Sequence, residues 1–427
     1  MADWGKIAVL GMGYIGLPTC AMFASKGISV VGVDVNKDVV ECVNRGKVHI
    51  VEPDLDGLIQ KVVSNGKLKA SLTPEAAEAF IIAVPTPFKG DHKPDIDFVL
   101  AATRCAAPCL KKGDLVVLES TSPVGTTRQI SKLLESLRPD LSFPHSAGED
   151  ADVLVAYSPE RVLPGKVLTE LVHNDRSIGG LSRRSSERAL SLYSTFVDGE
   201  LIVTSAETAE LVKLTENAFR DVNIAFANEL AAICGYLNLN VWEVISLANR
   251  HPRVNILQPG PGVGGHCIAV DPYFIIDAAP EQSRLMSTAR TINNARPHSV
   301  VEEVRRRMNG RKGATIACLG LSFKPNIDDL RESPAVEVVK LLVEADVGHI
   351  IACEPHVDAL PRALADLGVE FRDALTAIDR ADVIVLLVDH RQFGLIDPTA
   401  LEGKLLIDTR GLWTWRKAPN ARFRAHS

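Results

Sequence analysis

The segment from Pro259 to Asp271 is the part of the sequence in which we expect chemistry to occur. It reads Pro-Gly-Pro-Gly-Val-Gly-Gly-His-Cys-Ile-Ala-Val-Asp, so its first seven positions hold four glycines and two prolines. Such a run forms neither a stable helix nor a stable strand, and its bare backbone lets a ligand come close. Cys267 stands two residues after the last of these glycines. A thiol presented by a stiff turn is a candidate nucleophile. The alternative is that Cys267 is a small buried hydrophobic residue in a loop.

The length and composition of the chain limit the classes of function. The 427 residues suggest two or three domains, and the net charge of −6 argues against a nucleic-acid-binding protein. We expect no membrane span, because no run approaches the roughly 20 apolar residues that one needs. The start of the chain leads directly into a predicted strand and leaves no room for a signal peptide. The eight cysteines are scattered, so we expect no metal site and a reducing, cytoplasmic location.

A dinucleotide-binding fingerprint opens the chain. The apolar strand Lys6–Leu10 is followed by Gly11, Gly13 and Gly16, then by a helical segment and a second apolar strand that ends at Asp34. The glycines would form the turn, let a pyrophosphate approach the helix N-terminus and let the helix pack on the strand. A carboxylate at position 34 would bind a ribose and repel a 2′-phosphate. The sequence therefore predicts that the cofactor is NAD.

Polar residues follow the later strands of this first region. Apolar strands are predicted at 80–84, 115–118 and 153–157. Thr86, Thr121, Thr127 and Glu160 come just after these strands, where loops line the ligand crevice of an open parallel sheet. They are candidate neighbours of cofactor or substrate, although threonines in turns equally often cap helices.

A long helix is predicted from about residue 206 to residue 237. Lys213, Asn217 and Arg220 share one face of it, because they stand at positions i, i+4 and i+7. A face that carries these side chains suits an anionic ligand or a developing oxyanion. The alternative is an ordinary solvated helix face.

Basic residues cluster in two further places. His251 and Arg253 stand just before the glycine run and are candidate phosphate contacts. A second alternation of strands and helices follows residue 309, with strands predicted at 315–319, 349–352, 382–388 and 405–407. Lys324, Arg331 and Arg410 lie after its strands. They would suit a nucleotide diphosphate, and structural salt bridges are the alternative.

Six ordered motifs resemble those of the UDP-glucose/GDP-mannose dehydrogenase family over nearly the whole chain. They are Gly11–Pro18, Glu119–Val124, Ser158–Arg161, Lys213–Asn217, Gly264–Cys267 with Asp271, and Phe323–Ser333. Two longer stretches, 82–92 and 249–260, resemble the branch of this family that acts on UDP-N-acetyl-D-mannosamine.

The resemblance implies an α/β fold in which two doubly wound Rossmann-like domains are joined by a central helical domain with one long helix. The expected domains are an NAD-binding domain (1–204), a central helical domain (205–308) and a UDP-sugar-binding domain (309–427). The implied reaction is a four-electron oxidation of the sugar C6 alcohol to a carboxylate with two NAD⁺. The substrate would be a UDP-N-acetylated hexosamine, and the product would serve cell-surface polysaccharide synthesis.

The resemblance also assigns roles to residues. Cys267 would form a thiohemiacetal and then a thioester, Lys213 and Asn217 would stabilise the oxyanion, and Asp271 or Glu160 would hold a water that acts as base. The implied cofactor contacts are Gly11, Gly13, Tyr14, Ile15, Gly16, Asp34, Thr86, Thr121, Thr127 and Arg331. The implied substrate contacts are Arg161, Val162, Lys213, Asn217, Arg220, His251, Arg253, Gly264, Phe323 and Lys324.

Three alternatives to this function stay open at the level of sequence. The substrate could be UDP-N-acetyl-D-glucosamine, which differs from the manno sugar only at C2. A non-catalytic sensor would bind the same ligands without producing NADH, and an epimerase would release no net NADH and would not need Cys267. The family also implies a homodimer formed through the central helix, an arrangement that could bring Arg253 into the partner's site.

Overall fold

The computed structural model describes residues 4–90, 92–163, 165–311 and 313–413. The chain divides into two compact units, Met1–Glu216 with Tyr273–Ala279, and Asn217–Pro272 with Pro280–Ser427. The three predicted domains, 1–204, 205–308 and 309–427, stay a prediction. Residue 91 of the predicted motif 82–92 and the chain ends 1–3 and 414–427 lie outside the described residues.

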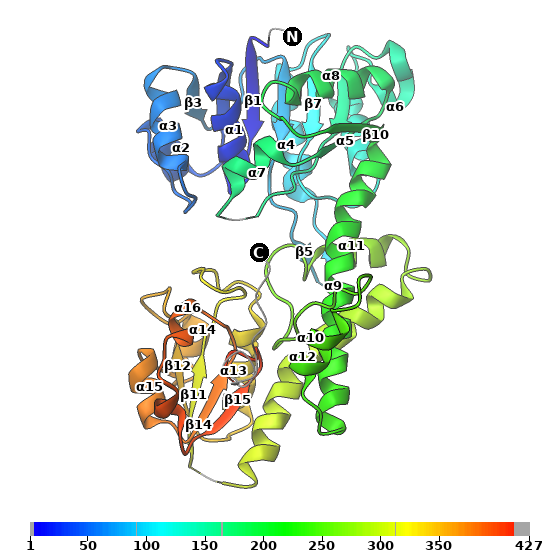
Figure 1. Ribbon diagram of the computed structural model, residues 1–427. Coiled ribbons are helices and arrows are strands. Elements are labelled where there is room, and N and C mark those ends of the chain that lie inside the picture. Colours follow the sequence, from blue (N-terminus) through cyan, green and yellow to red (C-terminus); the bar gives the residue numbers. More distant parts are fainter. Residues whose placement is uncertain (1–3, 91, 164, 312, 414–427) are drawn as a thin grey trace. The chain divides into compact units, whose positions relative to one another are not determined.

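The first unit contains an eight-stranded sheet, drawn from blue to green in Figure 1. Its strand order is β10-β9-β8-β7-β4-β1-β2-β3, and every neighbouring pair is parallel except β8 with β9. The part from β3 to β8 has the order of a dinucleotide-binding fold. The strands are β1 (Lys6–Leu10), β2 (Ser29–Val33), β3 (Leu68–Ser71), β4 (Ala79–Ile82), β7 (Leu115–Leu118), β8 (Leu154–Tyr157), β9 (Arg176–Gly180) and β10 (Leu201–Ser205).

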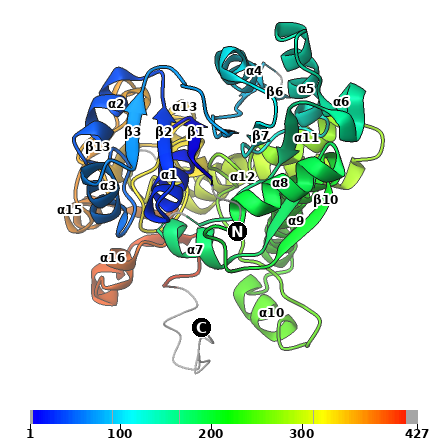
Figure 2. The same cartoon turned by 90° about the horizontal axis from the view of Figure 1, so that it is seen from above.

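Helices cover both faces of this sheet, and a short hairpin, β5 (Phe88–Lys89) with β6 (Lys93–Pro94), follows β4. The helices of the unit are α1 (Gly16–Ser25), α2 (Lys37–Asn44), α3 (Leu55–Ser64), α4 (Asp97–Ala106), α5 (Thr126–Leu137), α6 (Pro144–Ala147), α7 (Val167–His173) and α8 (Arg183–Tyr193), with short 3₁₀ turns η1 (Ala107–Cys109) and η2 (Gly148–Asp150). Figure 2 shows α1 and α7 on one side of the strands and α4 and α5 on the other.

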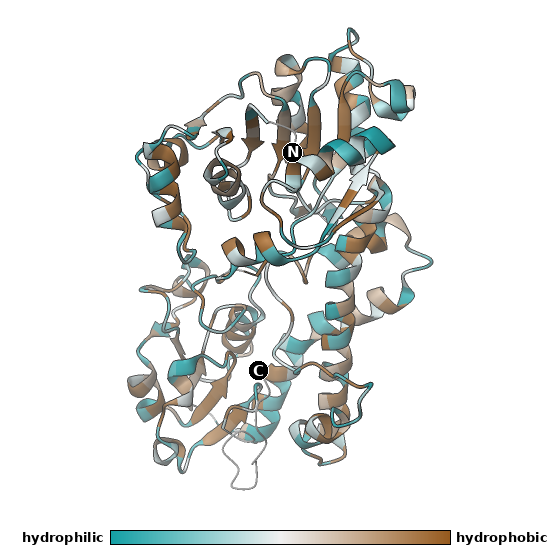
Figure 3. Cartoon of the chain, turned by 45° about the horizontal axis from the view of Figure 1, so that its top comes forward, coloured by the Kyte–Doolittle hydropathy of each residue, from teal (hydrophilic) through white to brown (hydrophobic). Residues whose placement is uncertain are grey.

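Apolar residues on both faces explain why the strands are buried. In β1, Ile7 and Val9 belong to the core that includes α1, whereas Ala8 and Leu10 belong to the core that includes α4 and α5. The strands are correspondingly coloured as hydrophobic in Figure 3. Continuous apolar runs of this kind are typical of parallel strands that are covered on both faces.

Helix α9 (Ala206–Tyr236) begins in the first unit and continues in the second. Its 31 residues contain neither Gly nor Pro before Gly235, and at about 1.5 Å per residue they span roughly 45 Å. Helix α11 (Asp271–Ala278) also has residues in both units.

The second unit contains a five-stranded parallel sheet with the order β13-β12-β11-β14-β15. Its strands are β11 (Thr315–Leu319), β12 (His349–Cys353), β13 (Glu370–Phe371), β14 (Val383–Leu386) and β15 (Leu405–Asp408). Its helices are α10 (Val241–Ala248), α12 (Arg284–Met308), α13 (Pro334–Glu344), α14 (Arg362–Ala365), α15 (Ala374–Arg380) and α16 (Arg391–Gly394), with the 3₁₀ turn η3 (Pro398–Leu401).

The predicted fold class is confirmed: two Rossmann-like sheets and a helical region with one long helix are present. Among the described residues, every helix is too short or too polar to cross a lipid bilayer.

Candidate active site

The turn between β1 and α1 has the shape that a pyrophosphate requires. Gly11 has φ +97°, in the left-handed region that favours glycine, and a Cβ on Gly16 would lie only 1.9 Å from the Gly11 carbonyl oxygen. At Gly13, a Cβ would meet no atom within 4 Å, so this position faces open space. The neighbouring predicted contacts, Tyr14 and Ile15, are exposed and half-buried at the start of α1. The turn therefore fits a dinucleotide at the N-terminus of α1.

Asp34 is held in place by this same turn. Its Oδ2 accepts a hydrogen bond from the backbone N–H of Met12 (2.9 Å), and its Oδ1 accepts one from the N–H of Asn36 (2.9 Å). The side chain is half-buried, and each carboxylate oxygen keeps a further lone pair that can accept a ribose hydroxyl.

Replacing Asp34 with Asn should raise the affinity for NADP⁺ relative to NAD⁺ by about 10-fold or more, because it removes the charge that repels a 2′-phosphate. The Asn oxygen can still accept the Met12 hydrogen bond, so the turn is preserved. Titration calorimetry with both cofactors measures the ratio. The matched control is Asp38→Asn, an exposed carboxylate in α2. Unchanged discrimination in the Asp34 variant would contradict the ribose contact.

The predicted threonines have different surroundings. Thr86 Oγ1 donates to the carbonyl oxygen of Thr121 (2.5 Å), and both residues are half-buried. Thr127 is fully buried, and its N–H and hydroxyl both donate to Oε1 of Glu210 from α9 (2.8 and 2.6 Å). Burial raises the pKa of Glu210, although these hydrogen bonds oppose that rise. Thr127 thus helps to join α5 to α9, and its contact with the cofactor stays a prediction.

Lys213 and Glu160 come together in the first unit. Lys213 is 7% exposed, and its Nζ donates to the carbonyl oxygen of Glu160 (2.8 Å) and lies 3.4 Å from Glu160 Oε1. Glu160 Oε2 accepts from the N–H of Val162 (2.8 Å). The alternative of an ordinary solvated helix face does not describe Lys213, because its amine is buried and donates to the loop after β8.

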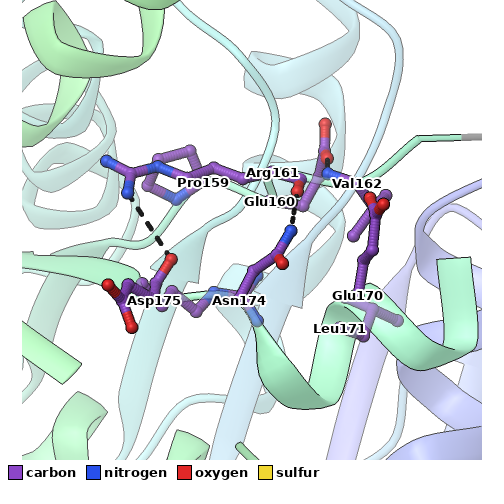
Figure 4. Close-up of a pocket in the computed structure, with 9 residues that line it drawn as sticks. Pro159, Glu160, Arg161, Val162, Glu170, Leu171, Asn174 and Asp175 are labelled. Carbon is purple, nitrogen blue, oxygen red and sulfur yellow. Dashed lines mark hydrogen bonds between the residues drawn. The ribbon is translucent and has the colours of Figure 1, made fainter. Parts of the chain in front are cut away.

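Arg161 lies beside a small pocket in the same loop. Its guanidinium donates to Ser177 Oγ (3.0 Å) and lies 2.8 Å from Glu216 Oε1, and its carbonyl oxygen accepts from Asn174 Nδ2 (2.5 Å). Figure 4 shows Arg161 and Asn174 among the pocket residues, with Glu160 and Val162 on the same loop. These contacts fix the loop that carries Glu160.

Asn217, Asp271 and Cys267 lie in the second unit. Asn217 Nδ2 donates to Asp271 Oδ2 (2.6 Å), and Asp271 is 3% exposed at the first position of α11. The Cys267 carbonyl oxygen accepts from the N–H groups of Val270 (3.0 Å) and Asp271 (2.8 Å). Cys267 itself is exposed. The alternative that Cys267 is a small buried hydrophobic residue is therefore wrong, and Cys267 is exposed in the turn that leads into α11.

The glycine run is packed against the segment that follows β11. Gly265 has φ +84°, and a Cβ there would lie 2.8 Å from the ring of Phe323; a Cβ on Gly264 would lie 2.3 Å from the carbonyl oxygen of Glu332 and 2.6 Å from Pro334. A larger residue at position 264 would require movement of the backbone, and one at position 265 would displace the Phe323 ring and strain a left-handed backbone conformation. The glycines of this run are thus required by close approach, and Phe323 lies next to the turn that carries Cys267.

A buried polar network, which the sequence analysis missed, holds the start of the glycine run. Asn228 of α9 accepts from the N–H of Gly260 (2.9 Å) and donates to Asn293 of α12 (2.9 Å). Asn293 and Arg290 both donate to Asp221 Oδ1 (2.8 and 2.7 Å). Burial raises the pKa of Asp221, and Arg290 opposes this rise. Polar residues on the inner face of a long helix were the only available signal.

A buried ion pair in the first unit was also missed, although its glutamate begins the motif Glu119–Val124. Glu119, directly after β7, forms an ion pair with Arg176 and accepts from Thr19 Oγ1 (3.3 Å) and from the hydroxyl of Tyr193 (3.3 Å). Burial raises the pKa of Glu119, and the charge of Arg176 opposes this rise.

The remaining predicted contacts are basic residues and lie in the second unit. Arg220, His251 and Arg253 are exposed, and His251 Nδ1 accepts from the N–H of Arg253 (3.3 Å). Lys324 is half-buried, and Arg331 makes a two-pronged contact with Asp329 (2.8 and 2.7 Å).

Together, the described residues supply the groups that an alcohol-to-acid oxidation needs. A dinucleotide turn, an amine and a carboxylate occur in the first unit, and an amide donor, a carboxylate and an exposed thiol occur in the second. Lys213 and Asn217 are one helical turn apart on α9.

The chain matches the three domains of a known enzyme family and several named relatives. The NAD-binding, central and UDP-binding domains of the UDP-glucose/GDP-mannose dehydrogenase family match residues 5–197, 207–295 and 317–414. The chain is 58% identical to an NDP-N-acetyl-D-galactosaminuronic acid dehydrogenase of Ralstonia nicotianae, covering 97% of this chain and 98% of the relative. It is 57% identical to a UDP-N-acetyl-D-mannosamine dehydrogenase of Yersinia pestis, covering 95% and 99%.

The fold also matches that of solved structures. The UDP-D-ManNAc dehydrogenase of Pyrococcus horikoshii superposes with a TM-score of 0.87 at 39% identity, over 95% of this chain and 96% of that one. The prediction that the cofactor is NAD is confirmed by the NAD-binding domain. The chain therefore belongs to the UDP-glucose/GDP-mannose dehydrogenase family and is an NAD-dependent nucleotide-sugar dehydrogenase.

Proposed function

We propose that the chain oxidises C6 of UDP-N-acetyl-D-mannosamine to the carboxylate, giving UDP-N-acetyl-D-mannosaminuronate for cell-surface polysaccharide synthesis. The names of relatives from Yersinia pestis and Escherichia coli, at 57% and 54% identity, support this sugar. The observation that carries the proposal is the exposed thiol of Cys267, four residues before an Asp271 that is hydrogen-bonded to Asn217.

The residues that would hold the cofactor are Gly11, Gly13, Gly16 and Asp34, with Thr86 and Thr121 at the ends of the neighbouring strands. NAD⁺ bound there would supply the oxidising power for both two-electron oxidations. The protein groups bind and orient the reactants and move protons.

Cys267 would act after the alcohol has become an aldehyde. Its thiolate attacks the aldehyde carbon and forms a C–S bond, giving a thiohemiacetal. Oxidation of this adduct yields a thioester, and water then breaks the C–S bond to release the carboxylate and return the thiol. This sequence explains why a dehydrogenase of this family carries a nucleophile.

Lys213 and Asn217 would stabilise the sugar oxygen as it gains negative charge. An ammonium group and an amide N–H, aimed at a developing oxyanion, stabilise the transition state more than the ground state. Glu160 and Asp271 already accept hydrogen bonds from these two residues, and either carboxylate could hold the water that takes the hydroxyl proton.

The substrate would contact the basic residues Arg161, Arg220, His251, Arg253 and Lys324, with Val162, Gly264 and Phe323 beside them. Charged side chains of this kind suit the diphosphate. We also propose a homodimer that forms through α9, supported by Phe219, Phe226 and Ile233, which recur every seven residues and are 67%, 53% and 48% exposed.

A second candidate substrate is the galacto epimer, a nucleoside-diphosphate N-acetyl-D-galactosamine, which the name of the 58% identical Ralstonia nicotianae relative favours. The gluco epimer is the third sugar to compare. The manno sugar should give the highest kcat/KM, with two NADH for each sugar converted, as measured by NADH absorbance and by mass spectrometry of the uronate. A preference for another epimer would overturn the proposed sugar, and binding without NADH would indicate the non-catalytic sensor.

A further inference from the structure

A buried polar cluster occupies the carboxyl ends of the three central strands of the second sheet. Ser322 follows β11, Glu354 comes directly after β12, and His390 follows β14. Glu354 is 3% exposed and His390 is fully buried. Strand β11 lies between β12 and β14, so these loops meet at the edge of the sheet where open α/β folds bind ligands.

Glu354 gathers donors from three segments. Its Oε2 accepts from the N–H groups of Leu321 (2.7 Å) and Ser322 (3.0 Å) and from His390 Nε2 (3.0 Å), and its Oε1 accepts from the N–H of His356 (3.0 Å). Burial alone would raise the pKa of Glu354, but these hydrogen bonds and the imidazole lower it below its ordinary value. The carboxylate therefore anchors the first two residues after β11.

The hydrogen bonds of His390 determine its tautomer. Its Nδ1 accepts from the N–H of Asn326 (2.9 Å), so in the neutral imidazole the proton lies on Nε2, which then donates to Glu354. Glu354, His356 and His390 have ligand atoms within 4.8 Å of one another. Because both ring nitrogens of His390 already have hydrogen-bond partners, we interpret the cluster as a structural chain of hydrogen bonds rather than as a set of metal ligands.

His390 thereby holds the middle of the segment 321–331, and Glu354 holds its start. Asn326 has φ +63°, an unfavourable backbone conformation for most residues, and its Oδ1 accepts from the N–H of Arg391 (2.9 Å). Between these anchors lie Phe323, which packs on Gly265 next to the Cys267 turn, and Lys324.

We propose that His390 and Glu354 are positioning residues of the nucleotide-sugar site. Their hydrogen bonds to the backbone fix the segment that presents Phe323 and Lys324. This inference rests on the proposed function, in which that segment binds the UDP moiety. The cluster contains no group that would touch the reacting atoms, so its effect should be on nucleotide affinity.

The test compares two variants that each keep one of the two His390 contacts. His390→Gln keeps a donor near Glu354 and loses the acceptor for Asn326, whereas His390→Asn keeps an acceptor near the Nδ1 position. The control is His349→Gln, because His349 also pairs with a glutamate, Glu370 (2.8 Å), but stands at the opposite end of β12 and is exposed.

Titration calorimetry with UDP and with NAD⁺ gives the readout. His390→Gln should raise the Kd for UDP by about 10-fold or more, as misplaced binding groups typically do, with an unchanged Kd for NAD⁺. His390→Asn should bind UDP more tightly than His390→Gln, and the His349 variant should match the wild type. Hydrogen exchange should show faster exchange of the Asn326 amide in His390→Gln alone.

Equal UDP affinity for the wild type and His390→Gln, or an equal loss of UDP and NAD⁺ affinity, would overturn the inference alone. A wild-type chain that binds no UDP would overturn the proposed function, and the inference with it.

Discussion

Replacing Cys267 with Ser should reduce formation of the uronate by a factor on the order of 10³ or more, the scale at which loss of a catalytic nucleophile acts. A serine hydroxyl is a far weaker nucleophile than a thiolate, so the aldehyde would persist. NADH should then not exceed one for each sugar. Mass spectrometry of the sugar product, together with NADH absorbance, distinguishes the aldehyde from the acid.

Cys105→Ser is the matched control, because Cys105 is also an exposed thiol but belongs to α4 of the first unit. Its variant should form the acid at the wild-type rate. If the Cys267 variant did so too, the thioester step would have to be abandoned, and the oxidation would proceed without a covalent intermediate.

Replacing Lys213 with Ala should lower kcat by about 10²- to 10³-fold, the usual effect of removing one oxyanion donor. KM should change much less, because the developing charge exists only in the transition state. Steady-state kinetics with the sugar substrate measure both values. The Lys213→Met variant keeps the apolar stem of the side chain and should show the same fall in kcat.

The lysine also ties α9 to Glu160, so thermal unfolding of each variant is needed to separate catalysis from stability. Lys132→Met is the control, since Lys132 is an exposed lysine of α5. A Lys213→Met variant with an unaltered kcat would reduce Lys213 to a structural link between the helix and the loop after β8.

Much of the fold could be predicted from continuous apolar runs with clear ends. The strands at 6–10, 115–118 and 315–319 have the predicted bounds, and the helix predicted from about 206 to 237 is α9 (Ala206–Tyr236). Buried parallel strands are apolar on both faces, so their signal is strong and ends at a glycine or a polar residue.

Other strands were missed because tertiary contacts alone explain them. Strand β10 (Leu201–Ser205) is largely exposed, and β9 (Arg176–Gly180) contains two glycines and an arginine, which are poor strand signals. Gly179 is needed because a Cβ would lie 2.5 Å from the carbonyl oxygen of Ser205. Arg176 is buried because it pairs with Glu119.

The candidate site shows the same limit. The helical spacing of Lys213 and Asn217 was visible in the sequence, but their partners Glu160 and Asp271 lie 53 and 54 residues away. His390 and Glu354 carry no spacing signal at all, because they come from separate strands that the sheet brings together.

The continuity of α9 has a consequence for protein engineering. Lys213 and Asn217 are separated by one turn of an unbroken helix. The helical backbone therefore sets the distance and the relative direction of the two donors. Inserting one residue between them would rotate the second donor by about 100° around the helix axis and advance it by about 1.5 Å. An insertion inside this stretch of α9 would therefore separate the two donors even though every side chain is kept.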